Sequence, residues 1–130
     1  MKKIYFILLI ASLLFANYIA PANVSGSQLI DSQEAYEMFQ KGSKFIDVRP
    51  ERFIKKGKIK NAYHLYSDSF SKQKLNSIAK VNENIVIYCN GQGCSLSAEA
   101  IVKAVKYGYT KIYYYRDGYP AWKYYKLPIE

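Results

Sequence analysis

Short apolar runs, each ended by a polar residue or a turn, constrain the fold of this chain more than any other feature. They cover residues 45–48, 85–88 and 112–115, and their length is typical of strands buried on both faces. Between them, apolar residues recur at helical spacing over residues 75–79 and 101–105. Buried strands that alternate with helices predict an α/β domain in which a parallel sheet is covered on both sides.

Local signals add one more helix and the limits of the domain. Asp31 and Glu34 have the spacing of a capping box, and Gly42 lies where the C-terminal cap of a short helix belongs. No repeat, low-complexity tract or linker divides residues 23–130. The sequence therefore predicts one domain, in which ligands bind outside the carboxyl ends of the strands.

The composition excludes several classes of protein. Half of the 130 residues are hydrophobic and 22% are charged, which is far from the composition of disordered chains. Two cysteines and one histidine cannot supply a four-ligand Cys/His zinc site, and they allow one disulfide at most. The net charge of +9 favours anionic partners, but no nucleic-acid-binding motif is visible. We therefore expect no metal, no organic cofactor and no nucleic-acid partner.

The N-terminus has the layout of a secretory signal peptide. Two lysines precede an uncharged apolar run over residues 4–16, and small residues follow up to Ala22. This layout predicts a signal peptide over residues 1–22 and a mature, periplasmic or secreted domain over residues 23–130, with no stable membrane association after cleavage. An uncleaved N-terminal helix that anchors the domain is the alternative.

The loop after residues 85–88 carries the candidate chemistry. Two glycines allow successive main-chain N–H groups to turn inward before the next helix, which forms an anion-binding concavity. Cys89 begins the loop, and the partial positive charge there is expected to lower the pKa of its thiol. The alternative is that Cys89 is only a small buried apolar residue. The remaining loop residues, expected to bind substrate, are Asn90, Gly91, Gln92, Gly93, Cys94 and Ser95.

Four motifs in order resemble the rhodanese-like family, from about Gln28 to Glu130. The resemblance implies a doubly wound, mainly parallel five-stranded sheet with helices on both faces. It also implies that Cys89 takes up sulfane sulfur as a persulfide from donors such as thiosulfate. The motifs are Asp47-Val48-Arg49, residues 57–62, residues 85–89 with their glycine-containing loop, and Arg116-Asp117-Gly118 followed by Trp122.

The chain departs from the family pattern at three places. Leu96 and Ser97 stand where the family usually has an arginine and a serine, so the site lacks a bidentate oxyanion clamp. Lys58 stands in place of a histidine, and Cys94 lies inside the loop. Cys94 either attacks an oxidised or persulfide state of Cys89 or packs under the loop.

The supporting residues are expected at the neighbouring strand and at the start of the next helix. Family members often pair a carboxylate with a guanidinium beneath this loop, so the resemblance gives Asp47 and Arg49 a scaffolding role. This role requires that the pair be buried, because an ion pair exposed to solvent contributes little to the stability of a protein. Ser97, near the start of the next helix, is the third residue expected to support the site.

The leading hypothesis is an exported sulfurtransferase with a small anionic sulfur donor and a thiol or cyanide acceptor. The thiolate of Cys89 attacks the outer sulfur of the donor, and the loop amides hold the resulting persulfide. Two alternatives stay open. One is a non-catalytic module that binds an anion or a protein, suggested by Leu96, and the other is a thiol–disulfide switch between Cys89 and Cys94.

Overall fold

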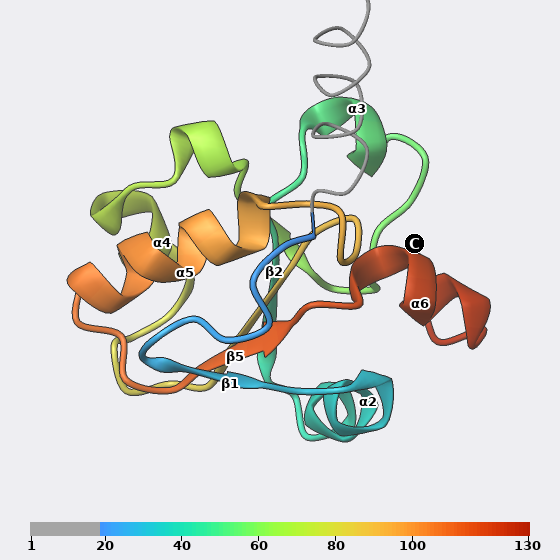
Figure 1. Cartoon of the computed structure of the whole chain (residues 1–130), viewed down its shortest axis with the longest axis horizontal. Helices are drawn as coiled ribbons and strands as arrows, with labels where there is room; N and C mark the ends of the chain where they lie inside the picture. Colours follow the sequence, from blue (N-terminus) through green and yellow to red (C-terminus); the bar gives the residue numbers. More distant parts are fainter. Residues whose placement is uncertain (1–18) are drawn as a thin grey trace, which may run out of the picture.

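All five strands of the sheet run parallel, in the order β1-β5-β4-β2-β3 (Figure 1). The computed structural model describes residues 19–130. The predicted five-stranded α/β fold is confirmed. The strands are β1 (Ser27–Leu29), β2 (Lys44–Asp47), β3 (Tyr63–His64), β4 (Ile85–Tyr88) and β5 (Ile112–Tyr115).

The inner strands lie where the apolar runs predicted them. Every residue of β4 is buried, because this strand pairs with β2 on one side and β5 on the other. The edge strands β1 and β3 are only three and two residues long and largely exposed. Segments this short contain no recognisable period, which is why the sequence analysis did not predict them.

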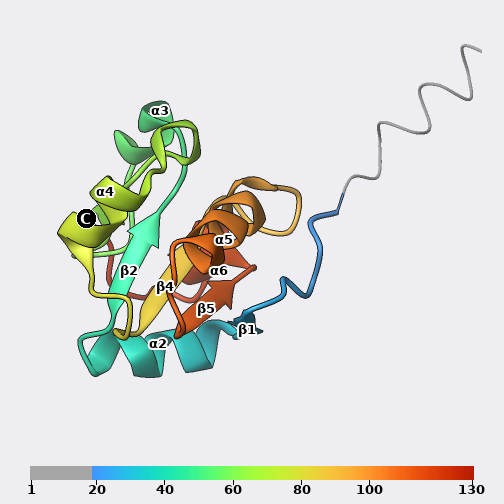
Figure 2. The same cartoon turned by 90° about the vertical axis from the view of Figure 1, so that its left-hand side faces the viewer.

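Helices cover both faces of the sheet (Figure 2). Helices α4 and α5 pack on one face, and α2 and α6 pack on the other. Asp31 and Glu34 form the predicted capping box at the start of α2. The helices are α2 (Ser32–Gln40), α3 (Glu51–Ile54), α4 (Lys72–Ile78), α5 (Leu96–Lys106) and α6 (Gly118–Tyr124), with a 3-10 turn η1 (Ser67–Ser69).

The alternation of side chains along β4 decides the surroundings of the loop that follows it. Val86 and Tyr88 point into the core beneath α2 and α6 with Trp122, whereas Ile87 and Cys89 point into the core beneath α4 and α5. The side chain of Cys89 is therefore directed toward α5, the helix whose N-terminus closes the loop.

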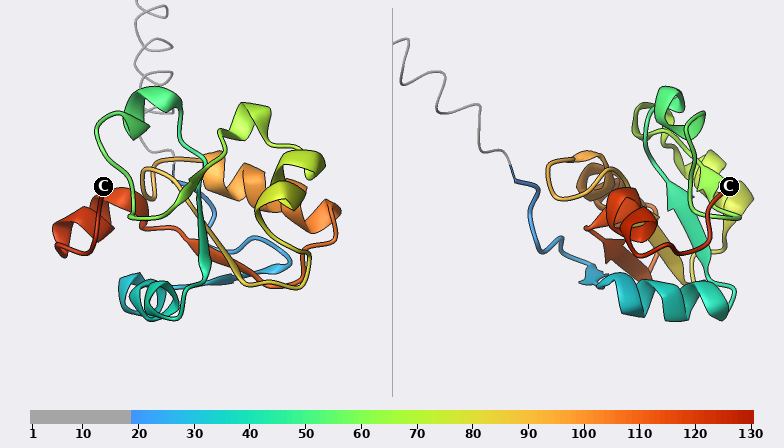
Figure 3. Two further views of the ribbon diagram at one scale, coloured as in Figure 1. Left: turned by 180° about the vertical axis from the view of Figure 1, so that it is seen from behind. Right: turned by 90° about the vertical axis from the view of Figure 1, so that its right-hand side faces the viewer.

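The C-terminal segment returns to the middle of the chain. Ile129 forms an isolated antiparallel bridge with Ile59, and the indole N–H of Trp122 donates to the main-chain oxygen of Pro128 at 2.7 Å. Figure 3 shows this segment beside the connection between α3 and β3. The contact holds the 57–62 motif against the sheet.

The signal-peptide prediction falls mainly on residues 1–18, which lie outside the described residues. Among residues 19–130, no helix has the length and the apolar character needed to cross a membrane.

Candidate active site

The candidate site lies at the carboxyl end of the sheet, where the loop between β4 and α5 meets the ends of β2 and β5. The residues of this loop are Cys89, Asn90, Gly91, Gln92, Gly93, Cys94 and Ser95. This position agrees with the general rule for ligand sites of open α/β sheets.

Two hydrogen bonds and the backbone conformation of Gly91 hold the loop in a tight curl. Gly91 has a φ of 101°, and its main-chain oxygen accepts a hydrogen bond from the N–H of Cys94 at 3.0 Å. The Gln92 side chain donates to a carboxylate oxygen of Asp117 at 2.9 Å. The curl brings Cys94 back over Cys89, so that both thiols belong to one compact turn.

Cys89 is enclosed at the base of this turn. Its exposed fraction is 1%, and its Sγ lies 3.2 Å from the hydroxyl oxygen of Ser97 and 3.5 Å from the main-chain oxygen of Cys94. The structure therefore brings together Cys89 and Ser97, two of the residues that the sequence analysis singled out. Both cysteines are free thiols.

The expected pKa of Cys89 requires a correction. The loop was expected to lower this pKa, but hydrogen bonding of the Cys89 thiol to the Cys94 thiol, together with burial, raises it. The same interaction between the two thiols, helped by the main-chain N–H groups of Asn90 and Leu96, lowers the pKa of Cys94 to about 6. The hydroxyl and the main-chain N–H of Ser97 favour a thiolate at Cys89, but the interaction with Cys94 and burial outweigh them.

Cys94 opens onto a surface depression that Cys89 does not reach. The depression has a volume of about 440 Å³ and is lined by one basic residue, Arg52, whose guanidinium carbon lies 4.7 Å from the centre of the Phe53 ring. It lies between α3 and the loop, so residues of two separate segments form it. Its lining residues are Pro50, Arg52, Phe53, Asn90, Gly93, Cys94, Ser95 and Leu96.

Asp47 and Arg49 form a buried ion pair under the loop. The exposed fraction of the Arg49 residue is 2%, and its Nη2 donates to the Asp47 carboxylate at 2.7 Å. Two further bonds tie Arg49 to Asn90 Oδ1 at 3.3 Å and to the main-chain oxygen of Gly57 at 2.8 Å. Burial alone would lower the pKa of Arg49, but the bonds and charge of Asp47 outweigh it and raise the pKa. The pair joins β2, the loop and the 57–62 motif.

The sequence analysis gave no site role to Tyr114, inside β5, or to Arg116, just after it, although Arg116 belongs to one of the four motifs. The hydroxyl of Tyr114 is buried and has no hydrogen-bond partner among residues 19–130. Burial raises its pKa, and Ser97, Cys89 and Arg116 lie near enough to influence it. Arg116 itself donates two hydrogen bonds to the main-chain oxygen of Ala20, at 2.6 and 3.2 Å. The period of two along β5 could have placed Tyr114 and Arg116 on the side of Cys89.

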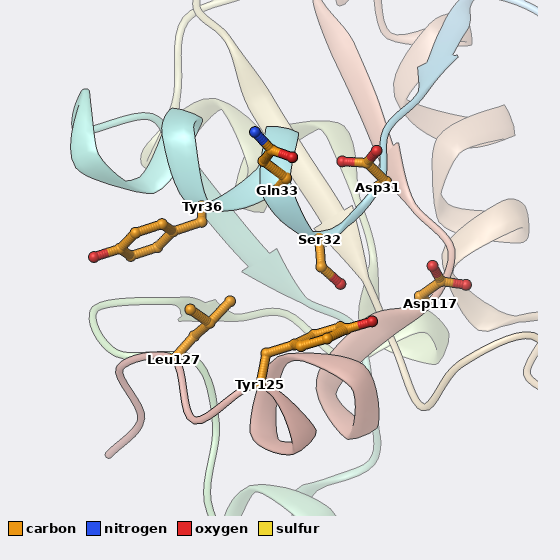
Figure 4. A pocket seen from close by; sticks show the side chains of 7 residues that line it. All are labelled: Asp31, Ser32, Gln33, Tyr36, Asp117, Tyr125 and Leu127. Carbon is orange, nitrogen blue, oxygen red and sulfur yellow. The ribbon is translucent and has the colours of Figure 1, made fainter.

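A second pocket lies away from both cysteines, between the start of α2 and helix α6 (Figure 4). It also has a volume of about 440 Å³, but it contains neither a thiol nor a basic side chain. The nucleophilic groups therefore locate the candidate site at the β4–α5 loop. The lining residues of this second pocket are Asp31, Ser32, Gln33, Tyr36, Asp117, Tyr125 and Leu127.

The described residues bring no metal-binding cluster to the site. Within residues 19–130, no three His, Cys, Asp or Glu side chains gather as ligands of an ion would. The single histidine, His64, has its Nε2 at 2.6 Å from the main-chain oxygen of Arg49, which is a contact of the scaffold. The groups that gather at the loop are two thiols, hydroxyls, main-chain amides and guanidinium groups.

The fold and the site together define a parallel α/β domain with a thiol-bearing loop in front of a helix. The family model of the Rhodanese-like domain matches residues 31–124, and the chain belongs to this family. The match covers all four motifs that carried the resemblance.

Relatives with known names agree with this assignment. The chain is 29% identical over 101 residues to "Thiosulfate sulfurtransferase GlpE" of Haemophilus influenzae, covering 78% of this chain and 92% of that protein. A solution structure of the "Polysulfide-sulfur Transferase Homodimer" of Wolinella succinogenes aligns with a TM-score of 0.67 and 23% identity, over 82% of this chain and 80% of that one. The crystal structure of the BH2092 protein of Bacillus halodurans aligns with a TM-score of 0.72 and 17% identity, over 100% and 86% of the two chains. The family therefore includes sulfurtransferases, and the two structures share the fold.

Proposed function

We propose that this protein is a sulfurtransferase that moves sulfane sulfur from a small anionic donor such as thiosulfate to a thiol or cyanide. The sulfur is held as a persulfide on Cys89. The observation that carries this proposal is the cysteine at the end of β4, enclosed with a second thiol in a loop of inward-facing amides. The names of the Haemophilus and Wolinella relatives support the same class of donor.

The groups at the loop suit this chemistry. A cysteine thiolate attacks the outer sulfur of thiosulfate, the S–S bond of the donor breaks, and sulfite leaves with the bonding electron pair. An acceptor thiolate or cyanide then attacks the outer sulfur of the persulfide, and the cysteine leaves as a thiolate. The hydroxyl of Ser97, 3.2 Å from the Cys89 sulfur, can donate a hydrogen bond to the charged form in each state.

The absence of the family's loop arginine leaves anion binding to other groups. Leu96, the residue at that position, is the first residue of α5 and lines the depression without contributing charge. Arg52 lines the same depression from α3, with its guanidinium over the ring of Phe53, another lining residue. We propose that Arg52 and the loop amides together hold the oxygens of the donor.

The test measures thiocyanate formed from thiosulfate and cyanide by the chain that begins at Asn23. We expect activity in the wild type and its loss when Cys89→Ser and Cys94→Ser are combined. Val102→Ser serves as the control, because Val102 is an exposed residue of α5 distant from the two thiols in sequence. A folded wild type that is inactive with thiosulfate and with polysulfide would contradict the proposal and favour a module that only binds an anion or a protein.

We also propose that residues 1–22 direct export and are removed after Ala22. The support is the order of two lysines, an apolar run and small residues. N-terminal sequencing of the protein isolated from its native cells tests this: Asn23 at the N-terminus of periplasmic or secreted material is the expected result. Retention of Met1, in the cytosol or in the membrane fraction, would overturn the cleavage.

A further inference from the structure

We infer that Cys94 is the thiol that meets the sulfur donor, and that Cys89 receives the sulfane sulfur from Cys94 inside the loop. This inference rests on the proposed sulfur transfer and divides it between two cysteines. Four observations carry it: access, the charge of the depression, the protonation of the pair and the surroundings of Cys89.

Access distinguishes the two thiols. Cys89 is 1% exposed and lines no part of the surface depression, so a dissolved donor has no open route to its sulfur. Cys94 is half-buried and lies in the wall of that depression. A donor that enters from solvent therefore meets Cys94 first.

The depression around Cys94 also has the charge that an anionic donor requires. Arg52 lines it, and the main-chain N–H groups of Asn90 and Leu96 act on the Cys94 sulfur. A cation and amides placed around one nucleophilic sulfur stabilise both its thiolate and an approaching oxyanion. No carboxylate is among the residues that line the depression. The nearby Glu99 carboxylate, which accepts a hydrogen bond from the Ser95 hydroxyl at 3.2 Å, opposes the Cys94 thiolate more weakly than these amides favour it.

The protonation of the pair agrees with this division. The pKa of Cys94 is lowered to about 6 by the hydrogen bond from Cys89, so Cys94 is a thiolate at neutral pH. Cys89 keeps its proton, because donating it to Cys94 and being buried both raise its pKa. The thiolate is the nucleophilic form, and it is present on the accessible cysteine.

The transfer between the cysteines needs no external oxidant or reductant. The Cys94 thiolate takes the outer sulfur of thiosulfate and releases sulfite. The sulfur of Cys89 then attacks the outer sulfur of the Cys94 persulfide, and the bond between that sulfur and Cys94 breaks. Cys94 leaves with the electron pair and accepts the proton that Cys89 gives up, which leaves an anionic persulfide on Cys89. Sulfane sulfur is exchanged at constant oxidation state.

Cys89 is surrounded by groups that can hold the transferred sulfur. The Ser97 hydroxyl oxygen is 3.2 Å from its sulfur. The Tyr114 hydroxyl belongs to the same buried cluster and has no partner among residues 19–130, although a buried hydroxyl usually has one. A persulfide anion on Cys89 would give this hydroxyl an acceptor. The enclosed position also protects the persulfide from dissolved oxidants. For delivery, the sulfur returns to Cys94 by the reverse exchange, and the acceptor thiolate or cyanide takes it there, where the depression opens to solvent.

Intact-mass analysis after brief exposure of the chain from Asn23 to thiosulfate tests the inference. We expect Cys89→Ser to gain one sulfur atom, carried on Cys94. We expect Cys94→Ser to load Cys89 at least about tenfold more slowly than the wild type, because the accessible thiolate is lost. Peptide mapping of the loaded wild type should find the sulfur on Cys89.

Three results would overturn the inference, and they differ from one another. Wild-type loading of Cys94→Ser, with none in Cys89→Ser, would make Cys89 the direct acceptor while leaving the proposed function intact. A Cys89–Cys94 disulfide with released hydrosulfide would remove the carrier role of Cys89 and support the thiol–disulfide switch. A wild type that gains no sulfur from thiosulfate or from polysulfide would overturn the function and the inference together.

A second variant separates donor binding from folding. Arg52→Ala keeps both cysteines but removes a cation from the depression. The thiosulfate concentration that gives half-maximal sulfur loading should therefore be several-fold higher than in the wild type. Lys55→Ala is the control, since Lys55 is an exposed cation one residue after α3 that does not line the depression. Equal half-maximal concentrations in both variants would contradict a role for this depression as the entry site.

Discussion

Gly118 lies directly against the main chain of Cys89. A Cβ atom placed on Gly118 would overlap the main-chain oxygen of Cys89 and lie 2.7 Å from the main-chain nitrogen of Gly91. The next residue, Tyr119, donates its N–H to the same Cys89 oxygen at 3.0 Å. The first turn of α6 therefore fixes the position at which the loop of the candidate site begins.

This relationship predicts that Gly118→Ala destabilises the domain by about 3 kcal/mol or more. The added Cβ overlaps the main chain of Cys89, and the φ of 65° is unfavourable for alanine. Gly42→Ala is the matched control. Gly42 has a φ of 81° with nothing within 4 Å of its added Cβ, so we expect a loss of only about 1 kcal/mol. Urea unfolding of both variants measures the difference. Equal losses of unfolding free energy would show that the close approach of Gly118 to Cys89 adds nothing to the cost of the substitution.

Removing the buried guanidinium beneath the loop should have a large effect. Arg49→Ala leaves the Asp47 carboxylate buried and without its main partner, so we expect a loss of about 3–5 kcal/mol in unfolding free energy. Lys111→Ala removes an exposed cation and should change stability by no more than about 0.5 kcal/mol. A loss below about 1 kcal/mol for Arg49→Ala would contradict its role as the link between β2, the loop and the 57–62 motif.

The rate of sulfur uptake should depend on pH through the thiolate of Cys94. The pKa of this group is about 6, so the fraction of thiolate falls as the pH drops below that value and is nearly complete at pH 7.5, about 1.5 units above the pKa. Stopped-flow measurement of sulfite release should show a rate that rises with pH and levels off near neutrality. In Cys94→Ser the rise should shift to higher pH, since burial still raises the pKa of the remaining Cys89 thiol after its contact with the Cys94 thiol is lost. A profile that is unchanged by the substitution would show that Cys94 is not the attacking group.

The unpartnered hydroxyl of Tyr114 should lengthen the lifetime of the Cys89 persulfide without stabilising the sulfur-free protein. Tyr114→Phe removes a buried hydroxyl that bonds nothing among residues 19–130, so the free energy of unfolding should be unchanged or slightly higher. The lifetime of the Cys89 persulfide should be shortened, because a hydrogen-bond donor to it is lost. Tyr119→Phe is the control, since its hydroxyl is also buried without a partner but lies beside Gly57. Equal persulfide lifetimes in both variants would rule out this contact.

The segment that ends at Ala22 contacts the loop of the candidate site. The N–H of Ala20 donates to the main-chain oxygen of Gln92 at 2.7 Å, and the oxygen of Ala20 accepts two hydrogen bonds from Arg116. Figure 1 shows this segment descending beside the β4–α5 loop. A chain that begins at Asn23 should therefore be less stable than one that begins at Ile19, by about 1–3 kcal/mol. It should also exchange the amide hydrogens of the loop faster. Identical exchange rates in the two chains would show that the segment does not restrain the loop.

The central elements of the fold could be predicted because their signals are local. Uninterrupted apolar runs placed β4 and β5 at their observed bounds, and the pair Asp31 and Glu34 placed the start of α2. Other elements were missed for the opposite reason. The strand β3 has two residues and is defined by its pairing with β2, and the helix α6, which begins at Gly118, was not predicted.

The sequence by itself determined the type of domain, the position of the thiol-bearing loop and the family, because hydrophobic periodicity and motif order are properties of neighbouring residues. The tertiary structure alone decided how the two cysteines differ. Burial and hydrogen bonding depend on groups from several segments: Ser97 and Tyr114 enclose Cys89, while Arg52 and the amides of the loop surround Cys94. No local pattern encodes which of two thiols five residues apart faces solvent and which one donates to the other, and these two features set the pKa order of the pair.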